Sequence, residues 1–248
     1  MICEVVVYNM ESALKAQEGG ADRIELCDNP VEGGTTPSHA MIEQVRQNIS
    51  MDVYVMLRPR GGDFLYSNYE FHIMKRDLYQ CQKLSVDGVV FGILKADGTI
   101  DKKRCAELVR IAKPLKVTCH RAFDMTRDPF EALEDCIEVG FDRILTSGQC
   151  ATAIEGAELI RQLTISAGER IKIMAGSGIR DHNVKQLVET TGVKEIHFSA
   201  ATIRPSGMGY VNTKISGMGS GSGSEYEIRT VDPNAVRSIR AIAESTVI

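Results

Sequence analysis

The chain alternates between short apolar runs and longer stretches in which apolar residues recur at a helical spacing. A regular alternation of this kind is typical of a parallel sheet with crossover helices. Eight apolar runs predict strands, and they begin near Ile2, Asp22, Asp52, Asp87, Leu115, Asp142, Arg170 and Lys194. Eight amphipathic stretches predict the helices that follow, at residues 10–19, 38–48, 69–84, 101–112, 129–139, 152–166, 181–191 and 233–245.

Helix-start signals agree with this phasing. Asp128 precedes Pro129 and is followed three residues later by Glu131, which is the pattern of an N-cap, a first-turn proline and a capping box. Thr36-Pro37 and Asp232-Pro233 carry the same combination of a capping residue and a proline. These signals place helix starts directly after strand-to-helix loops.

A weak internal repeat supports a repeated βα unit. Residues 19–26 resemble residues 139–146, and each segment begins a strand straight after a helix. Eight such units in 248 residues predict a (β/α)8 barrel that occupies residues 1–248 as a single domain. The alternative is an open doubly wound sheet, which usually has fewer strands and a glycine-rich turn after the first one. Here the residues after strand one, 8–11, contain no glycine, which favours the barrel.

One segment, residues 204–228, interrupts the rhythm after strand eight. Its centre, residues 216–224, consists almost entirely of glycine and serine and predicts a flexible loop over about residues 205–225. We interpret this loop as a surface segment, and a mobile cover over the barrel mouth is the alternative. Arg204 lies close to the end of strand eight and is a candidate ligand contact.

Composition narrows the class of protein. Hydrophobic content of 43% and charged content of 25% are ordinary for a soluble globular protein. A net charge of -4 gives no basic footprint for nucleic acid. The chain shows neither a signal peptide nor an apolar segment long enough to cross a membrane, so we expect cytoplasmic residence. Seven scattered cysteines without a C-x-x-C pair argue against a disulfide framework and a zinc ribbon.

Strand alternation predicts which polar side chains enter the barrel. In strand two the apolar residues on either side of Glu25 should face the helices, which sends Glu25 inward. The same alternation sends Arg58, His120 and His197 inward from strands three, five and eight. Because an unpaired buried charge is costly, Glu25 and Arg58 should pair or share a ligand. Glu25, His120 and His197 are therefore candidate catalytic residues, with a satisfied structural network as the alternative.

Two groups of loops are candidate ligand-binding segments. Arg58 and Arg60 flank a proline and are followed by two glycines, a pattern that suits a carboxylate or phosphate. A glycine-rich turn in which Asp63 pairs with an arginine is the alternative. Late loops of (β/α)8 proteins often hold phosphate, and small residues suit that task. The remaining candidates follow strands five to eight, and they are Arg121, Asp124, Ser147, Gly176, Ser177, Gly178 and Ser199.

Several of these segments together resemble the CutC family of copper-homeostasis proteins. The resemblance covers residues 1 to about 204 and is weaker beyond them. It implies a cytoplasmic (β/α)8 barrel, a homo-oligomer, and a link to copper tolerance or Cu(I) binding. The matching stretches are residues 20–27, 32–38, 58–64, 120–124, 145–148 and 174–176.

The residues leave two functions open. Cu(I) prefers thiolate and thioether ligands, and Cys27 is the best candidate because it shares the inward parity of Glu25. A buried small hydrophobe is the alternative interpretation of Cys27. Cys119 and His120 are adjacent on a strand, so their side chains should point in opposite directions. The second hypothesis is an enzyme that acts on a small anionic or phosphorylated metabolite at the barrel mouth, with neither nucleic acid nor membrane as a partner.

Overall fold

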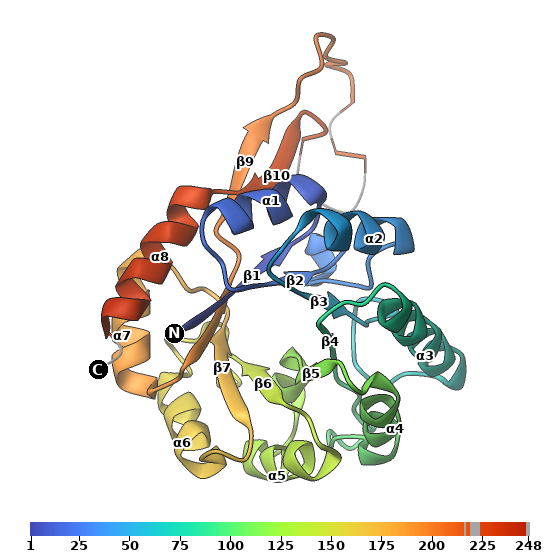
Figure 1. Ribbon diagram of the computed structural model, residues 1–248, viewed down its shortest axis with the longest axis vertical. Helices are drawn as coiled ribbons and strands as arrows, with labels where there is room; N and C mark the ends of the chain where they lie inside the picture. Colours follow the sequence, from blue (N-terminus) through green and yellow to red (C-terminus); the bar gives the residue numbers. More distant parts are fainter. Residues whose placement is uncertain (216, 219–223, 247–248) are drawn as a thin grey trace.

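The computed structural model describes residues 1–215, 217–218 and 224–246. Eight parallel strands close into a barrel in chain order, and β8 pairs with β1. The predicted (β/α)8 barrel is thereby confirmed, with the helices around the strands in Figure 1. The strands are β1 (Ile2–Val7), β2 (Arg23–Leu26), β3 (Asp52–Met56), β4 (Gly88–Phe91), β5 (Lys116–Cys119), β6 (Arg143–Thr146), β7 (Lys172–Gly176) and β8 (Glu195–Phe198).

The helices lie where the periodicity predicts them, with differences at some ends. The sixth helix begins at Ala157 instead of residue 152, because residues 152–156 form a bend and turns. The α-helices are α1 (Met10–Glu18), α2 (His39–Asn48), α3 (Asn68–Lys83), α4 (Lys102–Ala112), α5 (Pro129–Val139), α6 (Ala157–Ala167), α7 (Asp181–Thr191) and α8 (Pro233–Thr246). Two short 3-10 helices, η1 (Pro30–Glu32) and η2 (Arg121–Met125), lie in loops after β2 and β5.

Capping explains two of these boundaries. Asp128 accepts hydrogen bonds from the backbone N–H groups of Phe130 and Glu131, as the sequence predicts for the start of α5. Thr36 does not cap α2, because Ser38 occupies the N-cap. The Thr36 hydroxyl instead accepts from the backbone N–H of Arg58 at 2.9 Å. This bond joins the loop before α2 to the end of β3.

The internal repeat has a structural counterpart at the strand starts. The Asp22 carboxylate accepts the backbone N–H of Cys3 in β1 at 2.8 Å, and the Asp142 carboxylate accepts that of Val117 in β5 at 2.8 Å. Asp87, in the looser third copy, does the same for the start of β3. Each aspartate therefore satisfies a donor on the neighbouring strand and helps to fix the register.

Alternate strand residues separate an outer core from an inner one. The outer core lies between strands and helices and includes Ile24, Cys119 and Ile196. A smaller cluster of Cys27, Tyr54, Met56 and Val90 forms apart from it, with side chains of the opposite parity. This separation is the alternation that the sequence predicts.

An antiparallel hairpin projects from the barrel after β8. It consists of β9 (Ala201–Pro205) and β10 (Glu227–Val231), which pair along their full length and extend away from the helices in Figure 1. The flexible loop predicted over about residues 205–225 lies between these two strands, which the sequence interpretation did not predict, and residues 216 and 219–223 of that loop lie outside the described residues. Arg204 is not the ligand contact that the sequence suggests. Its guanidinium binds the Glu11 carboxylate at 2.8 to 3.0 Å and does not line the mouth cavity.

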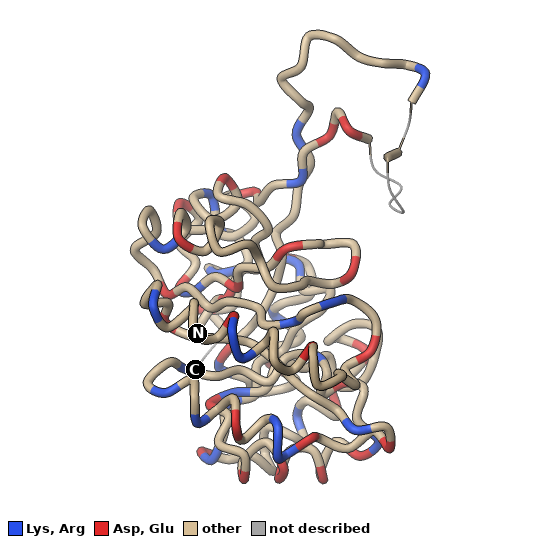
Figure 2. Tube along the Cα trace, turned by 90° about the vertical axis from the view of Figure 1, so that its right-hand side faces the viewer, with Lys and Arg blue, Asp and Glu red and all other residues tan. Residues whose placement is uncertain are grey.

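Charges of both signs are distributed over the barrel (Figure 2). Several of them form ion pairs at the surface, such as Arg161–Glu158 on α6 and Arg170–Glu134. Among the described residues, no helix combines the length and the apolar character that a membrane span requires.

The floor of the barrel holds a buried ion-pair network. Arg23 binds Glu4 and, at 2.8 Å, the carboxylate of Glu195. Arg143 binds the same Glu195 oxygen at 2.6 Å. The two guanidinium groups also lie over the Tyr54 ring, 4.7 and 5.3 Å from its centroid. Four charged side chains therefore neutralise one another out of contact with water, which is the condition under which buried charges are tolerated.

We expect Glu195→Gln to destabilise the fold by about 3–5 kcal/mol, because it leaves two buried arginines without their shared countercharge. Urea unfolding measures this loss. Glu169→Gln is the matched control, since Glu169 is 93% exposed and pairs with Lys172 at the surface, where such pairs contribute about 1 kcal/mol or less. Equal, small effects of the two substitutions would show that the network does not hold the barrel together.

Candidate functional site

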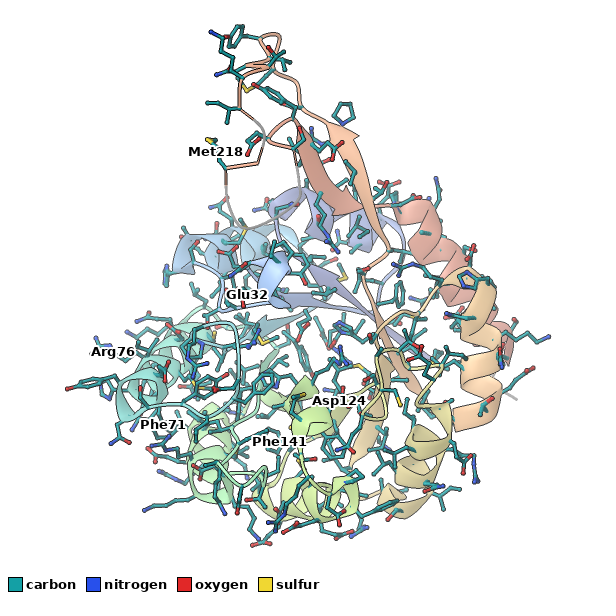
Figure 3. The ribbon with its side chains drawn as sticks, turned by 180° about the vertical axis from the view of Figure 1, so that it is seen from behind. Glu32, Phe71, Arg76, Asp124, Phe141 and Met218 are labelled. Atoms are coloured by element: carbon teal, nitrogen blue, oxygen red, sulfur yellow. The ribbon has the colours of Figure 1, made fainter. Side chains whose placement is uncertain are left out.

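A cavity of about 420 Å³ opens at the C-terminal ends of the barrel strands. This end is where barrels of this class place their active sites. Asp124 lies close to the centre of the ring of strands in Figure 3, whereas Arg76 lies on α3 at the periphery. The predicted site residues that line the cavity are Glu25, Arg58, His120, Arg121, Asp124, Ser177, Gly178, His197 and Ser199.

Glu25 and His197 form a pair at the base of the cavity. Glu25 Oε2 lies 3.7 Å from His197 Nε2, while the other ring nitrogen lies 2.8 Å from Glu4 Oε1. Burial raises the pKa of the Glu25 carboxyl to about 7. Burial opposes protonation of His197, but the hydrogen bond to Glu4 and the charge of Glu25 raise its pKa nonetheless. Glu25 therefore exchanges its proton near neutral pH, and His197 beside it keeps its proton more readily than a free imidazole, as suits groups that transfer protons.

His120 is a neutral hydrogen-bond donor at the same cavity. Its Nδ1 accepts the backbone N–H of Ala122 at 3.1 Å, so the ring proton of the neutral imidazole is on Nε2. Burial, helped by the charge of Arg58, lowers the pKa of His120 to about 3. Nε2 has no hydrogen-bond partner among the described residues. Gly92 makes room for the ring, because a Cβ there would lie 2.9 Å from His120 Nδ1.

Arg58 joins two loops above the barrel. Its Nη1 donates to the carbonyls of Glu32 at 2.6 Å and Gly34 at 2.9 Å, and its Nη2 donates to the carbonyl of Gly62 at 2.7 Å. Of the two predicted arrangements, the direct pairing of Arg58 with Glu25 is therefore wrong, because backbone carbonyls bind the terminal nitrogens of the guanidinium, and a ligand shared by the two residues stays a prediction. Only Nε of Arg58 is left without a partner among the described residues.

Asp124 holds the loop that follows β6. It accepts from the backbone N–H and the hydroxyl of Ser147 at 3.1 and 3.0 Å, and from Arg121 Nε at 2.7 Å. Ser147 is fully buried and is not part of the cavity lining, so the prediction that it contacts a ligand was wrong. Arg121 and Asp124 line the cavity but satisfy each other.

Three other predicted ligand contacts also lie away from the cavity. Arg60 pairs with Asp63 at 2.9 Å and with Glu70 at 2.6 Å, which is the turn that we considered as the alternative. Gly176 lies within β7, and a Cβ there would come within 2.5 Å of Leu145 Cδ1 and 3.3 Å of His197 Cβ. This glycine therefore makes room for Leu145 and His197 instead of presenting its backbone to a ligand.

The loop after β7 contributes two cavity residues, Ser177, which the sequence predicts, and Arg180, which the sequence interpretation missed. Ser177 adopts a left-handed φ of 86° and donates its hydroxyl to the carbonyl of Ala151 at 2.8 Å. Such backbone strain concentrates at functional sites. Arg180 follows two residues after Gly178 and lines the cavity. Its position at the start of α7, directly after the Gly-Ser-Gly turn, was the available signal. Glu4 was missed too, although it interrupts an apolar strand just as Glu25 does.

Cys27 lies beneath the cavity wall with a sulfur neighbour. Its Sγ and the terminal methyl carbon of Met56 lie 3.2 and 3.6 Å from the position that a Cβ on Gly34 would take, so the two side chains are adjacent. Burial raises the pKa of the Cys27 thiol well above its usual range. A thiol beside a thioether suits Cu(I) in donor type. Over the described part of the chain, no three or more histidine, cysteine or acidic side chains are grouped so as to hold a metal ion.

The fold and the cavity define a (β/α)8-barrel protein with a cavity lined by polar side chains at its C-terminal mouth. The model of the CutC family matches residues 1–202, and the chain belongs to this family. It is 47% identical over 247 residues to the human "Copper homeostasis protein cutC homolog", covering 100% of this chain and 90% of that protein. A CutC family protein from Parabacteroides distasonis is 46% identical, covering 96% and 98% of the two chains.

Solved structures agree with this assignment. The crystal structure of CutC from Streptococcus agalactiae has a TM-score of 0.77 and 33% identity, and it covers 80% of this chain and 98% of that one. Thiamine phosphate pyrophosphorylase from Pyrococcus furiosus has a TM-score of 0.60 at 17% identity and covers 100% and 97%. At that level of identity the second likeness shows the barrel fold alone.

We expect Glu25→Gln to stabilise the protein more at pH 8 than at pH 4. In the folded state the pKa of Glu25 is raised from 4.5 to about 7, so its contribution to stability is present below pH 4.5 and is lost as the pH rises through 7. Gln cannot ionise and avoids this loss, which amounts to about 3 kcal/mol. Urea unfolding from pH 4 to pH 8 measures it, with Glu189→Gln on α7 as the control. A constant difference between wild type and Glu25→Gln would contradict the raised pKa.

Proposed function

We propose that this protein acts in copper homeostasis, the role in the names of its relatives, and that it does so with an active site for a small anionic metabolite. The observation that carries the proposal is the Glu25–His197 pair in the mouth cavity. A carboxyl whose pKa is about 7 beside an imidazole whose pKa is raised suits general acid–base catalysis near neutral pH. Cytoplasmic residence and a homo-oligomeric state, which the family resemblance implies, belong to the same proposal.

Unpaired positive charge at the cavity supports an anionic substrate. Arg58 and Arg180 both line it, and neither has an acidic side chain within 4 Å among the described residues. Arg180 uses one nitrogen to bind the carbonyl of Ile179. Its guanidinium therefore retains donors for a carboxylate or phosphate, which arginine binds in a fork.

The volume of the cavity supports a small ligand. About 420 Å³ lies in the lower part of the range found for pockets that bind small molecules. The wall combines Phe64 and Leu145 with a few polar groups, as such pockets usually do. A macromolecular partner would require a much larger surface than this opening offers.

Arg180→Gln should weaken the binding of inorganic phosphate by roughly tenfold, because a charge-assisted hydrogen bond contributes about 1.5–3 kcal/mol. Isothermal titration calorimetry measures the affinity. Arg170→Gln is the matched control, since Arg170 pairs with Glu134 at the opposite end of the barrel. An equal loss in both variants, or a wild-type protein that binds neither phosphate nor a simple carboxylate such as malonate, would contradict an anion site at the mouth.

A second candidate function is direct binding of Cu(I) by Cys27 and Met56. The adjacency of the thiol and the thioether favours it, because both donors are of the soft type that Cu(I) prefers. Binding would require the buried thiol to lose its proton, so the affinity should rise with pH. Glu25, whose charge adds to the effect of burial on the thiol pKa, is the adjacent group able to take that proton.

Cys27→Ser should lower the affinity for Cu(I) by roughly 100-fold, at least as much as the loss of an outer-shell partner costs a metal site. A titration against a Cu(I) chelator measures the change. Met56→Leu should lower it less, and Cys81→Ser, which alters a buried thiol on α3, is the control. If Cys27→Ser binds Cu(I) as tightly as wild type, copper does not bind at this pair.

A further inference from the structure

Three buried polar atoms of the mouth residues lack hydrogen-bond partners among the described residues. They are Glu25 Oε1, His120 Nε2 and Arg58 Nε. All three residues line the cavity. A buried polar atom without a partner costs about 1–3 kcal/mol, and native structures retain such atoms where a ligand or a reaction uses them. Together they indicate which hydrogen-bonding groups a ligand of this cavity would have.

The two unpartnered nitrogens are both donors. His120 donates through Nε2, because its Nδ1 is occupied as an acceptor of the Ala122 N–H. Arg58 donates through Nε, because its terminal nitrogens bind loop carbonyls. Both side chains lie next to the Phe64 ring: the centroid of the His120 ring and the Cζ of Arg58 are 4.9 and 5.0 Å from its centroid. The missing partner at this place is therefore an oxygen acceptor.

The third atom belongs to the carboxyl group of Glu25 on β2, which lines the same cavity as these donors. His120 resists protonation, so it serves to donate a hydrogen bond instead of a proton. A neutral imidazole and a guanidinium that converge on one oxygen stabilise a negative charge as it develops there. A neighbouring carboxylate that takes a proton is the group that would create this charge.

We propose that the mouth cavity removes a proton from the carbon next to the carbonyl group of a small aldehyde or ketone that carries a phosphate or carboxylate. Glu25 takes the proton, and His120 Nε2–H and Arg58 Nε–H bind the carbonyl oxygen. This inference rests on the proposed function and names its reaction class.

The step balances without a co-reactant. The C–H bond breaks, its electron pair forms a carbon–carbon double bond, and the carbonyl π electrons move to the oxygen as an enolate. The Glu25 carboxylate becomes a carboxylic acid and then returns a proton to the same carbon, which restores the carbonyl compound. His197 lies 3.7 Å from Glu25 and exchanges the proton with water.

Deuterium incorporation from D2O tests the proposal, with glycolaldehyde phosphate, dihydroxyacetone phosphate, hydroxypyruvate and 2-oxoglutarate as probes. We expect wild-type protein to exchange at least one of them above the rate in buffer. Glu25→Gln should abolish this exchange. His120→Leu should lower its kcat by roughly 100-fold with little change in KM, as the loss of an oxyanion donor does. Glu189→Gln should exchange like wild type.

Phosphate binding separates the two levels of the proposal. If wild-type protein and His120→Leu both bind inorganic phosphate but no probe exchanges, the reaction class is wrong and the anion site stands. If phosphate does not bind and no probe exchanges, the proposed function fails as well. Exchange that survives in Glu25→Gln would overturn the assignment of the base, and circular dichroism of each variant shows whether it is folded.

Discussion

The Glu25–His197 pair at the mouth depends on the charge balance of Glu4 in the barrel interior. One of its oxygens binds Arg23 and the other lies 2.8 Å from His197 Nδ1. Burial opposes the ionisation of Glu4, but Arg23 and His197 together lower its pKa to about 2. The ion-pair network therefore keeps Glu4 ionised, with its negative charge next to the imidazole of His197. Since a buried ion pair is stable only when all its members are satisfied, the position of His197 follows from the ion pairs beneath it.

Burial acts on the titratable mouth residues in different directions, and this difference divides their roles. The same exclusion of water that keeps Glu25 protonated up to a pH of about 7 keeps His120 neutral down to a pH of about 3. His197 differs from His120 only in its neighbours, because two carboxylates face it while Arg58 faces His120. A site whose groups titrate this far apart can hold a base and a neutral donor together at one pH.

The sequence predicted the barrel and the four inward-facing mouth residues because strand alternation depends only on local geometry. It did not predict their partners. Arg58 binds carbonyls of the loops that follow β2 and β3, and Glu25 on β2 pairs with His197 on β8, on the other side of β1. Such pairings depend on how the loops fold over the mouth and on how the barrel closes, which periodicity does not encode. The β9–β10 hairpin was missed for a related reason, since its residues are mostly exposed on both faces and show no alternation of apolar and polar positions.

The two candidate functions share one pair of neighbouring side chains, Cys27 and Glu25, and this makes them dependent on each other. The Cys27 thiol is a donor next to Glu25 and favours the ionised form of the carboxylate. Cu(I) on the sulfur would replace the thiol proton and remove that donor. The pKa of Glu25 would then rise further, and less of it would be present as a base at neutral pH. Because such coupling is reciprocal, a ligand that needs ionised Glu25 would weaken Cu(I) binding by the same factor. A protein built this way links its small-molecule site to copper through a single side chain.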